Sequence, residues 1–274
     1  MDTDDARALI ALNNRFYRDH AASFSATRSA PWRGWARVTE LAAEATDAKV
    51  DEPLRVLDLA CGNMRLARHL ARALPHTRID YYGVDRCAEL AEAGHPSACS
   101  SDGDRLAPAQ VRMDFREVDI LEELLAPTAA SNNLESFAGI PACDLSCCFG
   151  FMHHVPSKDL RLAVIRTLIT STAPGGTVVL SFWRFMDDER LAAKARTVTE
   201  QARASGAAPA LDANDYLLGW QDDASALRYC HHFTENEISE LAHGVADCAQ
   251  EVERFSADGK SGALNRYLVL RRIG

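Results

Sequence analysis

Residues 56–70 read VLDLACGNMRLARHL, and this stretch decides the fold class of the chain. An apolar run ends at Asp58, a turn of small residues surrounds Gly62, and the leucines that follow recur on one helical face. A strand, a tight turn and an amphipathic helix in this order are typical of a βα unit in a parallel sheet. The turn has one of the three glycines of the dinucleotide-binding fingerprint, since Ala60 and Met64 stand in the other two places. The loop has therefore either lost a ligand or serves one without phosphates.

The composition indicates a globular protein. At 274 residues, 47% hydrophobic and 25% charged, the chain suffices for one large α/β domain or for a domain with an insertion. No apolar run approaches the ~20 residues of a membrane span, and the acidic N-terminus differs from a signal peptide, so we expect a cytoplasmic protein. The eight cysteines lack paired C-x-x-C spacing and are interpreted as reduced thiols. The net charge of −9 argues against a surface devoted to nucleic-acid phosphates, although a local basic patch is compatible with it.

Apolar runs alternate with helical patterns along the chain, as in parallel strands joined by crossover helices. Strands are predicted at Arg55–Leu59, Ile79–Val84, Val111–Val118, Leu145–Phe149 and Thr177–Phe182. Helices are predicted at Asp4–His20, Gly34–Ala48, Arg65–Leu74 and Lys158–Ser171. Two further runs, Glu251–Phe255 and Ala263–Arg271, predict an antiparallel hairpin that closes the sheet. The expected fold class is therefore α/β.

Two acidic residues stand where later strands end. Asp85 closes the run IDYYGVD, roughly 20 residues beyond Gly62, the distance at which an acid binds a ribose diol in dinucleotide-binding units. Asp119 stands at the end of the next strand. The carboxyl ends of parallel strands meet at one edge of the sheet, where open α/β sheets bind ligands. A cofactor with a ribose and an adenine but no pyrophosphate would use the turn and both acids, and S-adenosylmethionine is such a cofactor.

These residues, with the segments DLACGN at 58–63 and CDLSCCFGFMHHV at 143–155, resemble the class I S-adenosylmethionine-dependent methyltransferases. The resemblance implies a Rossmann-like sheet of seven mostly parallel strands with an antiparallel C-terminal hairpin and N-terminal helices. It implies that Asp58 and Gly62 lie beside the methionine part, that Asp85 takes the ribose hydroxyls and that Asp119 bonds the adenine amine. Four further residues of the implied cofactor site adjoin these positions: Ala60, Asn63, Arg86 and Ile120. Phe149, in the segment 143–155, would pack beside the cofactor.

Three further blocks resemble the tRNA wobble-uridine carboxymethyl methyltransferases: FSATRSAPW at 24–32, the doublet His153-His154, and RYCHHFTENEI at 228–238. The resemblance implies esterification of a carboxylate on a tRNA base, with tRNA and a small activating protein as partners. Transfer to a carboxylate needs in-line positioning more than a general base, because the acceptor is already ionised. Arg28 would bind the carboxylate of the acceptor or that of the cofactor's methionine, and one of the two histidines would orient the acceptor oxygen.

The stretch from Trp183 to Ala249 is too long for an ordinary connection, and we expect a helical lid that recognises the substrate. The candidate acceptor contacts are aromatic: Trp32, Trp183, Tyr216, Trp220 and Tyr229. Each of them would otherwise be a core residue. The expected organisation is residues 1–50 as an N-terminal helical cap, 51–182 as the cofactor-binding core, 183–249 as the lid, and 250–274 as the C-terminal hairpin of the core.

Alternatives to tRNA methylation stay open at this stage. The acidic net charge favours O- or N-methylation of a small metabolite, and the altered loop at Ala60 and Met64 is compatible with a non-catalytic binding protein. His231 and His232 follow Cys230, but no third and fourth ligand stands at zinc spacing, so no metal site is predicted.

Overall fold

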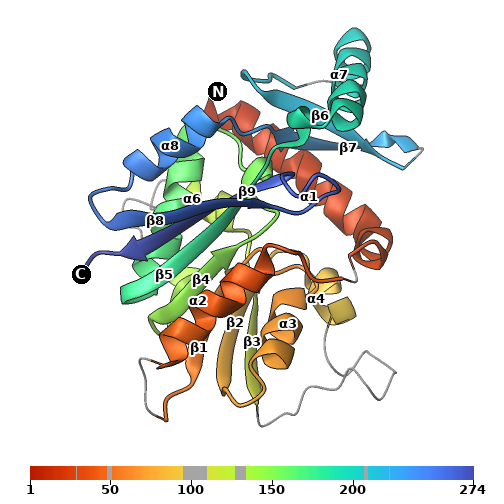
Figure 1. Ribbon diagram of the computed structural model, residues 1–274. Helices are drawn as coiled ribbons and strands as arrows, with labels where there is room; N and C mark the ends of the chain where they lie inside the picture. Colours follow the sequence, from red (N-terminus) through yellow and green to blue (C-terminus); the bar gives the residue numbers. More distant parts are fainter. Residues whose placement is uncertain (29, 48–50, 95–109, 127–133, 207–208, 222) are drawn as a thin grey trace.

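The computed structural model describes residues 1–28, 30–47, 51–94, 110–126, 134–206, 209–221 and 223–274. Its main sheet has seven strands in the order β3-β2-β1-β4-β5-β9-β8 (Figure 1). Five of them run parallel: β1 (Leu54–Leu59), β2 (Ile79–Asp85), β3 (Val111–Glu117), β4 (Cys143–Cys148) and β5 (Thr172–Trp183). β9 (Asn265–Arg272) pairs antiparallel with β5 and with β8 (Ala249–Ala257). The predicted seven-stranded sheet with an antiparallel C-terminal hairpin is confirmed.

Helices cover both faces of this sheet. The long helix α1 (Thr3–Ala26) has non-helical backbone at His20, and α2 spans Trp35–Asp47; Ala48, predicted to end that helix, lies outside the described residues. The connections between strands carry α3 (Arg65–Ala73), α4 (Ala88–Gly94), α5 (Ile120–Leu124) and α6 (Lys158–Ser171), and α8 (Glu235–His243) precedes β8.

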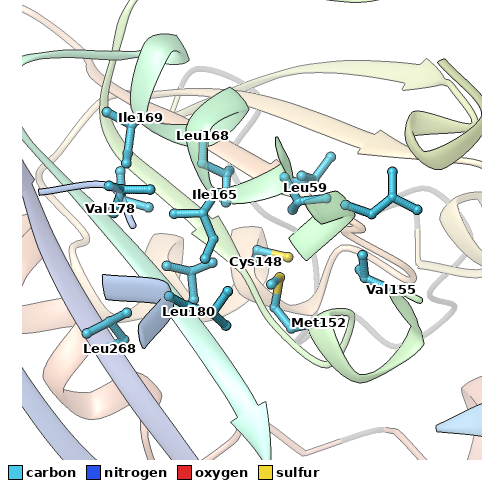
Figure 2. Close-up of a cluster of buried hydrophobic side chains, with 14 of the residues drawn as sticks. Leu59, Cys148, Met152, Val155, Ile165, Leu168, Ile169, Val178, Leu180 and Leu268 are labelled. Atoms are coloured by element: carbon cyan, nitrogen blue, oxygen red, sulfur yellow. The ribbon is translucent and has the colours of Figure 1, made fainter. Parts of the chain in front are cut away.

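Side chains that alternate along the strands fill two hydrophobic cores. Leu59 and Leu180 join a cluster on the α6 side, part of which is drawn in Figure 2, while Val56 and Val179 join a second cluster with Leu66 of α3. Successive side chains of a strand point to opposite faces, so a sheet covered on both sides needs apolar residues at consecutive positions. The consecutive apolar residues Val56 and Leu57 of β1, which belong to different clusters, are therefore a consequence of the central place of this strand in the sheet.

The segment predicted as a helical lid is mixed in structure. It contains α7 (Glu189–Ala204) and α8, but also a separate two-stranded sheet of β6 (Asp215–Trp220) and β7 (Asp223–His231). Leu217 and Tyr229 pack on one side of this hairpin, and Leu218 and Cys230 pack in a different cluster. This alternation is a strand period, which the helical interpretation of the segment missed. Figure 1 shows α7 and the hairpin beside α1, away from the seven-stranded sheet.

The sequence predicts reduced cysteines and no membrane-spanning segment. The described cysteines are free thiols, and Cys99 lies outside the described residues. None of the helices in the described ranges combines the length and the apolar character that a membrane crossing requires.

Candidate active site

A cavity of about 720 Å³ opens at the carboxyl ends of β1, β2, β3 and β4 and is covered by α1. Its volume is within the usual range for small-molecule and cofactor sites. The structure brings most of the predicted site residues to its wall: Arg28, Trp32, Asp58, Ala60, Gly62, Asn63, Asp85, Arg86, Asp119, Ile120, Phe149, His153, His154 and Trp183. Segments from both ends of the chain therefore meet at one site.

The loop after β1 keeps its tight turn with a single glycine. Ala60, Gly62 and Met64 have φ values of 59°, 51° and 52°, all in the left-handed region. For alanine and methionine this conformation costs about 1–2 kcal/mol each, which the surrounding structure must offset. The amides of Ala60 and Cys61 donate to the Val84 carbonyl at 2.7 and 3.2 Å, and Met64 is buried. These contacts with the neighbouring strand hold the turn without the other two glycines.

Asp85 is held by backbone donors on both sides. Its Oδ2 atom accepts from the Gly62 amide at 2.8 Å, and its Oδ1 atom accepts from the Cys87 amide at 2.8 Å. Burial raises the pKa of this carboxyl, and the amide donors oppose the rise. A carboxylate has about four lone-pair positions, so each oxygen keeps one for a further donor. A Cβ atom at Gly62 would meet nothing within 4 Å, which leaves open space beside the carboxylate for a ribose.

Asp119 has more partners than the sequence indicated. Its Oδ1 atom accepts from the Glu122 amide and so caps α5, while its Oδ2 atom accepts from Asn14 Nδ2 at 2.9 Å. Arg86 Nε lies 2.7 Å from the same Oδ2 atom. Oδ1 retains a lone pair for an amine, and the two side chains orient the carboxylate. Asn14 was not predicted, since nothing in its local sequence marks a contact so distant along the chain.

Asp58 lies beneath the loop and is 4% exposed. It accepts a hydrogen bond from the Tyr81 hydroxyl. Burial raises its pKa to about 7, and the charge of Asp85 adds to this, while Tyr81 and Arg65 act in the opposite direction.

The two histidines occupy different environments at the other end of the cavity. His154 Nδ1 lies 2.9 Å from the Tyr229 carbonyl oxygen and Nε2 lies 2.6 Å from the Tyr17 hydroxyl, so both nitrogens are engaged. Burial and the charge of Arg228 lower its pKa to about 3. His153 is also buried, and its Nδ1 atom has no hydrogen-bond partner among the described residues. Burial is the main cause that lowers the pKa of His153 well below its usual value.

Arg28 and Arg228 bring positive charge to this end of the cavity. The Arg28 guanidinium carbon lies 4.9 Å from the centre of the Phe24 ring. Neither arginine has a carboxylate within ion-pair distance in the described part of the chain. Arg228 and Tyr17 were not in the predicted site, although Arg228 begins the RYCHHF block that carries the resemblance.

Three predicted acceptor contacts lie elsewhere. The Tyr229 hydroxyl donates to Asp215 at 2.8 Å and accepts from Arg161 at 3.1 Å, in a buried network. Trp220 Nε1 donates to Ser23 Oγ at 3.1 Å, and Tyr216 packs against Phe185. None of Tyr216, Trp220 and Tyr229 lines the cavity. The register of the hairpin turns these side chains toward α1 and α7.

One buried group has the composition of a metal site. Ligand atoms of His153, His154 and Cys230 all lie within 4.8 Å of one another. Both nitrogens of His154 already have partners, and the charges of Arg28 and Arg228 act against a cation here. His231, from the doublet considered in the sequence, is held between Asp215 and Glu237 at 2.7 and 2.9 Å. We therefore assign no metal to either group.

Comparison with known proteins places the chain in a class. A family model described as a methyltransferase domain matches residues 26–245, and the chain belongs to this family. It is an S-adenosylmethionine-dependent methyltransferase, and S-adenosylmethionine is its cofactor. The carboxylates of Asp85 and Asp119 and the open space at Gly62 fit the ribose and adenine of that cofactor.

Several solved structures share the fold. A methyltransferase of this class from Methanosarcina mazei has a TM-score of 0.55 and 14% identity, over 83% of this chain and 95% of that one. Another from Clostridium acetobutylicum has a TM-score of 0.54 and 12% identity, over 95% and 99%. Magnesium protoporphyrin IX methyltransferase from Synechocystis, with bound S-adenosylhomocysteine, has a TM-score of 0.51 and 17% identity, over 86% and 82%. At these identities the likeness concerns the fold alone. No curated protein sequence matches the chain.

Proposed function

We propose that this methyltransferase esterifies a carboxylate, and that the acceptor is the carboxymethyl group of a modified tRNA wobble uridine. One observation carries the proposal: beside His153 and His154 the cavity holds two arginines that have no carboxylate partners in the described chain, and neither histidine is basic enough to take a proton at neutral pH. Arg28 and Arg228 attract an anion, whereas His153 and His154 are weak bases.

The acid–base properties of the two histidines and Tyr17 favour an acceptor that carries no proton to be removed. The bound cofactor supplies an electrophilic methyl group on a sulfonium sulfur. A hydroxyl or amine acceptor must lose a proton, and the base that takes it works best with a pKa near the operating pH. The pKa of His154 is about 3, and burial raises the pKa of Tyr17 to about 12. A carboxylate acceptor needs no base, because it is ionised at neutral pH and only has to be oriented.

The tRNA acceptor is supported by where the three resembling blocks lie. The block at 24–32 supplies Arg28 and Trp32, the doublet supplies His153 and His154, and the block at 228–238 supplies Arg228. Blocks that are distant in the sequence thus line one cavity. The neutral His153, with a free ring nitrogen, is suited to donate a hydrogen bond to the acceptor oxygen.

The test uses S-adenosylmethionine with a radiolabelled methyl group and total tRNA, with and without a small activating protein. A methyl ester releases volatile labelled methanol in mild alkali, whereas methyl groups on nitrogen or on a hydroxyl oxygen stay on the RNA. We expect base-labile label that is lost with the Asp85→Ala variant. Alkali-stable label on RNA would overturn esterification, and absence of label on RNA would overturn the tRNA acceptor.

A small acidic metabolite is the second candidate. The net charge of −9 disfavours a broad contact with RNA, and the cavity volume of about 720 Å³ is within the range for small ligands. A metabolite extract labelled in parallel separates the two candidates. Only methylation of a small acidic metabolite predicts base-labile label in the small-molecule fraction and none on tRNA.

A further inference from the structure

We propose that Arg228, oriented by the hydroxyl oxygen of Tyr17, forms an anion subsite that anchors the acidic group of the acceptor, while Arg28 serves the cofactor side. This inference rests on the proposed function, because it assigns the acceptor's carboxylate to one of the two arginines.

Arg228 is a buried cation with unused donor capacity. Its side chain is enclosed by the rings of Phe16, Trp183 and Trp220, whose centres lie 5.4, 5.8 and 5.5 Å from the guanidinium carbon. The residue is 8% exposed, and its Nε atom is buried with no hydrogen-bond partner in the described chain. Burial of a charge without a counter-ion is unfavourable, and aromatic faces offset this only in part. An anion that enters the cavity would complete the missing interactions.

The surroundings fix the direction of this guanidinium. Asn13 of α1 accepts from the Tyr229 amide at 2.7 Å and donates to its carbonyl at 3.1 Å, so α1 is bonded to β7 directly beside Arg228. Figure 1 shows the two elements side by side. Tyr17, one helical turn further along α1, is close enough for the charge of Arg228 to lower the pKa of its hydroxyl against a larger rise from burial. Since Tyr17 donates to His154 Nε2, its oxygen faces Arg228 as an acceptor.

The backbone of Arg28 is bonded to the loop after β1. Asn63 Nδ2 donates to the Arg28 carbonyl at 3.3 Å and to Ser25 Oγ at 3.2 Å. Burial lowers the pKa of Arg65, at the start of α3, to about 10, and the charge of Arg28 lowers it further. The loop at Asn63 is the part of the site that the family resemblance places beside the cofactor's methionine. From this bond to the loop and from the effect of its charge on Arg65 we assign the methionine carboxylate to Arg28, which leaves Arg228 for the acceptor.

The experiment measures binding to the full chain saturated with S-adenosylhomocysteine. The probes are 5-carboxymethyluridine and its neutral carboxamide, titrated by calorimetry. We expect the wild type to prefer the acid, and Arg228→Met to remove this preference by weakening acid binding roughly ten- to hundredfold. Arg228→Lys keeps the charge without the planar fork of arginine, and its preference for the acid should lie between those of the wild type and Arg228→Met. Arg196→Met, an exposed arginine on α7, is the control with the same change in charge.

A second readout separates the arginines. Arg28→Met should weaken S-adenosylmethionine binding, whereas Arg228→Met should change it less than about twofold, a result that also shows the variant is folded. An acid preference that survives Arg228→Met would overturn the subsite, as would equal affinity of the wild type for both probes or no binding of either. If the preference depends on Arg228 but tRNA receives no methyl ester, the subsite stands and the proposed tRNA acceptor fails. If Arg228→Met esterifies tRNA as the wild type does, the subsite fails and the function stands.

Discussion

The Nε2 atom of His154 lies 2.6 Å from the hydroxyl oxygen of Tyr17, which joins the turn after β4 to α1. A carbonyl oxygen can only accept, so we assign the proton of the ring to Nδ1, which faces the Tyr229 carbonyl, and Nε2 then accepts the Tyr17 proton. Asn13 Nδ2, which lies 3.1 Å from Nδ1, donates to the same carbonyl. His154 thus orients Tyr17 and has no free nitrogen for the acceptor. It acts as a positioning residue.

The rate of methyl transfer should be nearly independent of pH from about 6.5 to 9, because the carboxylate acceptor stays ionised throughout. The pKa values of His154 and Tyr17, about 3 and about 12, also lie outside this range. Single-turnover rates with saturating cofactor and acceptor provide the measurement. A log-linear rise with pH that disappears on substitution of His153 or His154 would indicate a histidine base and a hydroxyl or amine acceptor.

Asp85→Ala should weaken S-adenosylmethionine binding by about 1.5–3 kcal/mol for each charge-assisted hydrogen bond lost to the ribose. The substitution also removes the acceptor of the Gly62 amide, so the loop loses one of its ties. Titration calorimetry gives the affinity. Asp80→Ala, on the same strand but away from the cavity, should bind normally. Unchanged affinity in Asp85→Ala would remove Asp85 from the cofactor site.

Asp58→Asn should make the cofactor-free protein more stable than the wild type at neutral and alkaline pH. The pKa of Asp58 is about 7 in the folded protein, against an ordinary value of 3.8. The stability that its protonated form contributes is therefore fully present below pH 3.8 and is lost as the pH rises through 7. The difference in unfolding free energy between variant and wild type should therefore grow from about pH 4 to about pH 7, by about 2–4 kcal/mol. Urea unfolding at several pH values measures it, and a pH-independent difference would contradict the assignment.

Ala60→Gly should raise the unfolding free energy by up to about 1 kcal/mol, because glycine adopts the left-handed conformation of Ala60 without strain. Gly62→Ala is the matched opposite case. A Cβ atom there meets nothing within 4 Å, so only backbone strain of about 1 kcal/mol should appear, as a loss of stability. Thermal unfolding of both variants is the measurement, and changes of the same sign would show that backbone strain does not govern this turn.

Tyr229→Phe should lower the unfolding free energy by about 1–3 kcal/mol while cofactor affinity stays constant, since its hydroxyl bonds to Asp215 and Arg161 away from the cavity. Tyr216→Phe serves as the control because its hydroxyl has no hydrogen bond in the described structure. Loss of acceptor binding in Tyr229→Phe without loss of stability would instead make Tyr229 a substrate contact.

The sequence by itself determined the βα units and the cofactor end of the site. Strand and helix periods are local, and parallel strands bring their carboxyl ends to one edge, so Asp85 and Asp119 could be placed together from sequence alone. Only the tertiary structure decided the acceptor end. The register of β6 against β7 turned Tyr216, Trp220 and Tyr229 away from the cavity, and the bonding of Asn13 to β7 brought Tyr17 beside Arg228. Side-chain direction in a hairpin depends on pairing between strands, and contacts between residues 13 and 229 depend on packing, neither of which a local pattern encodes.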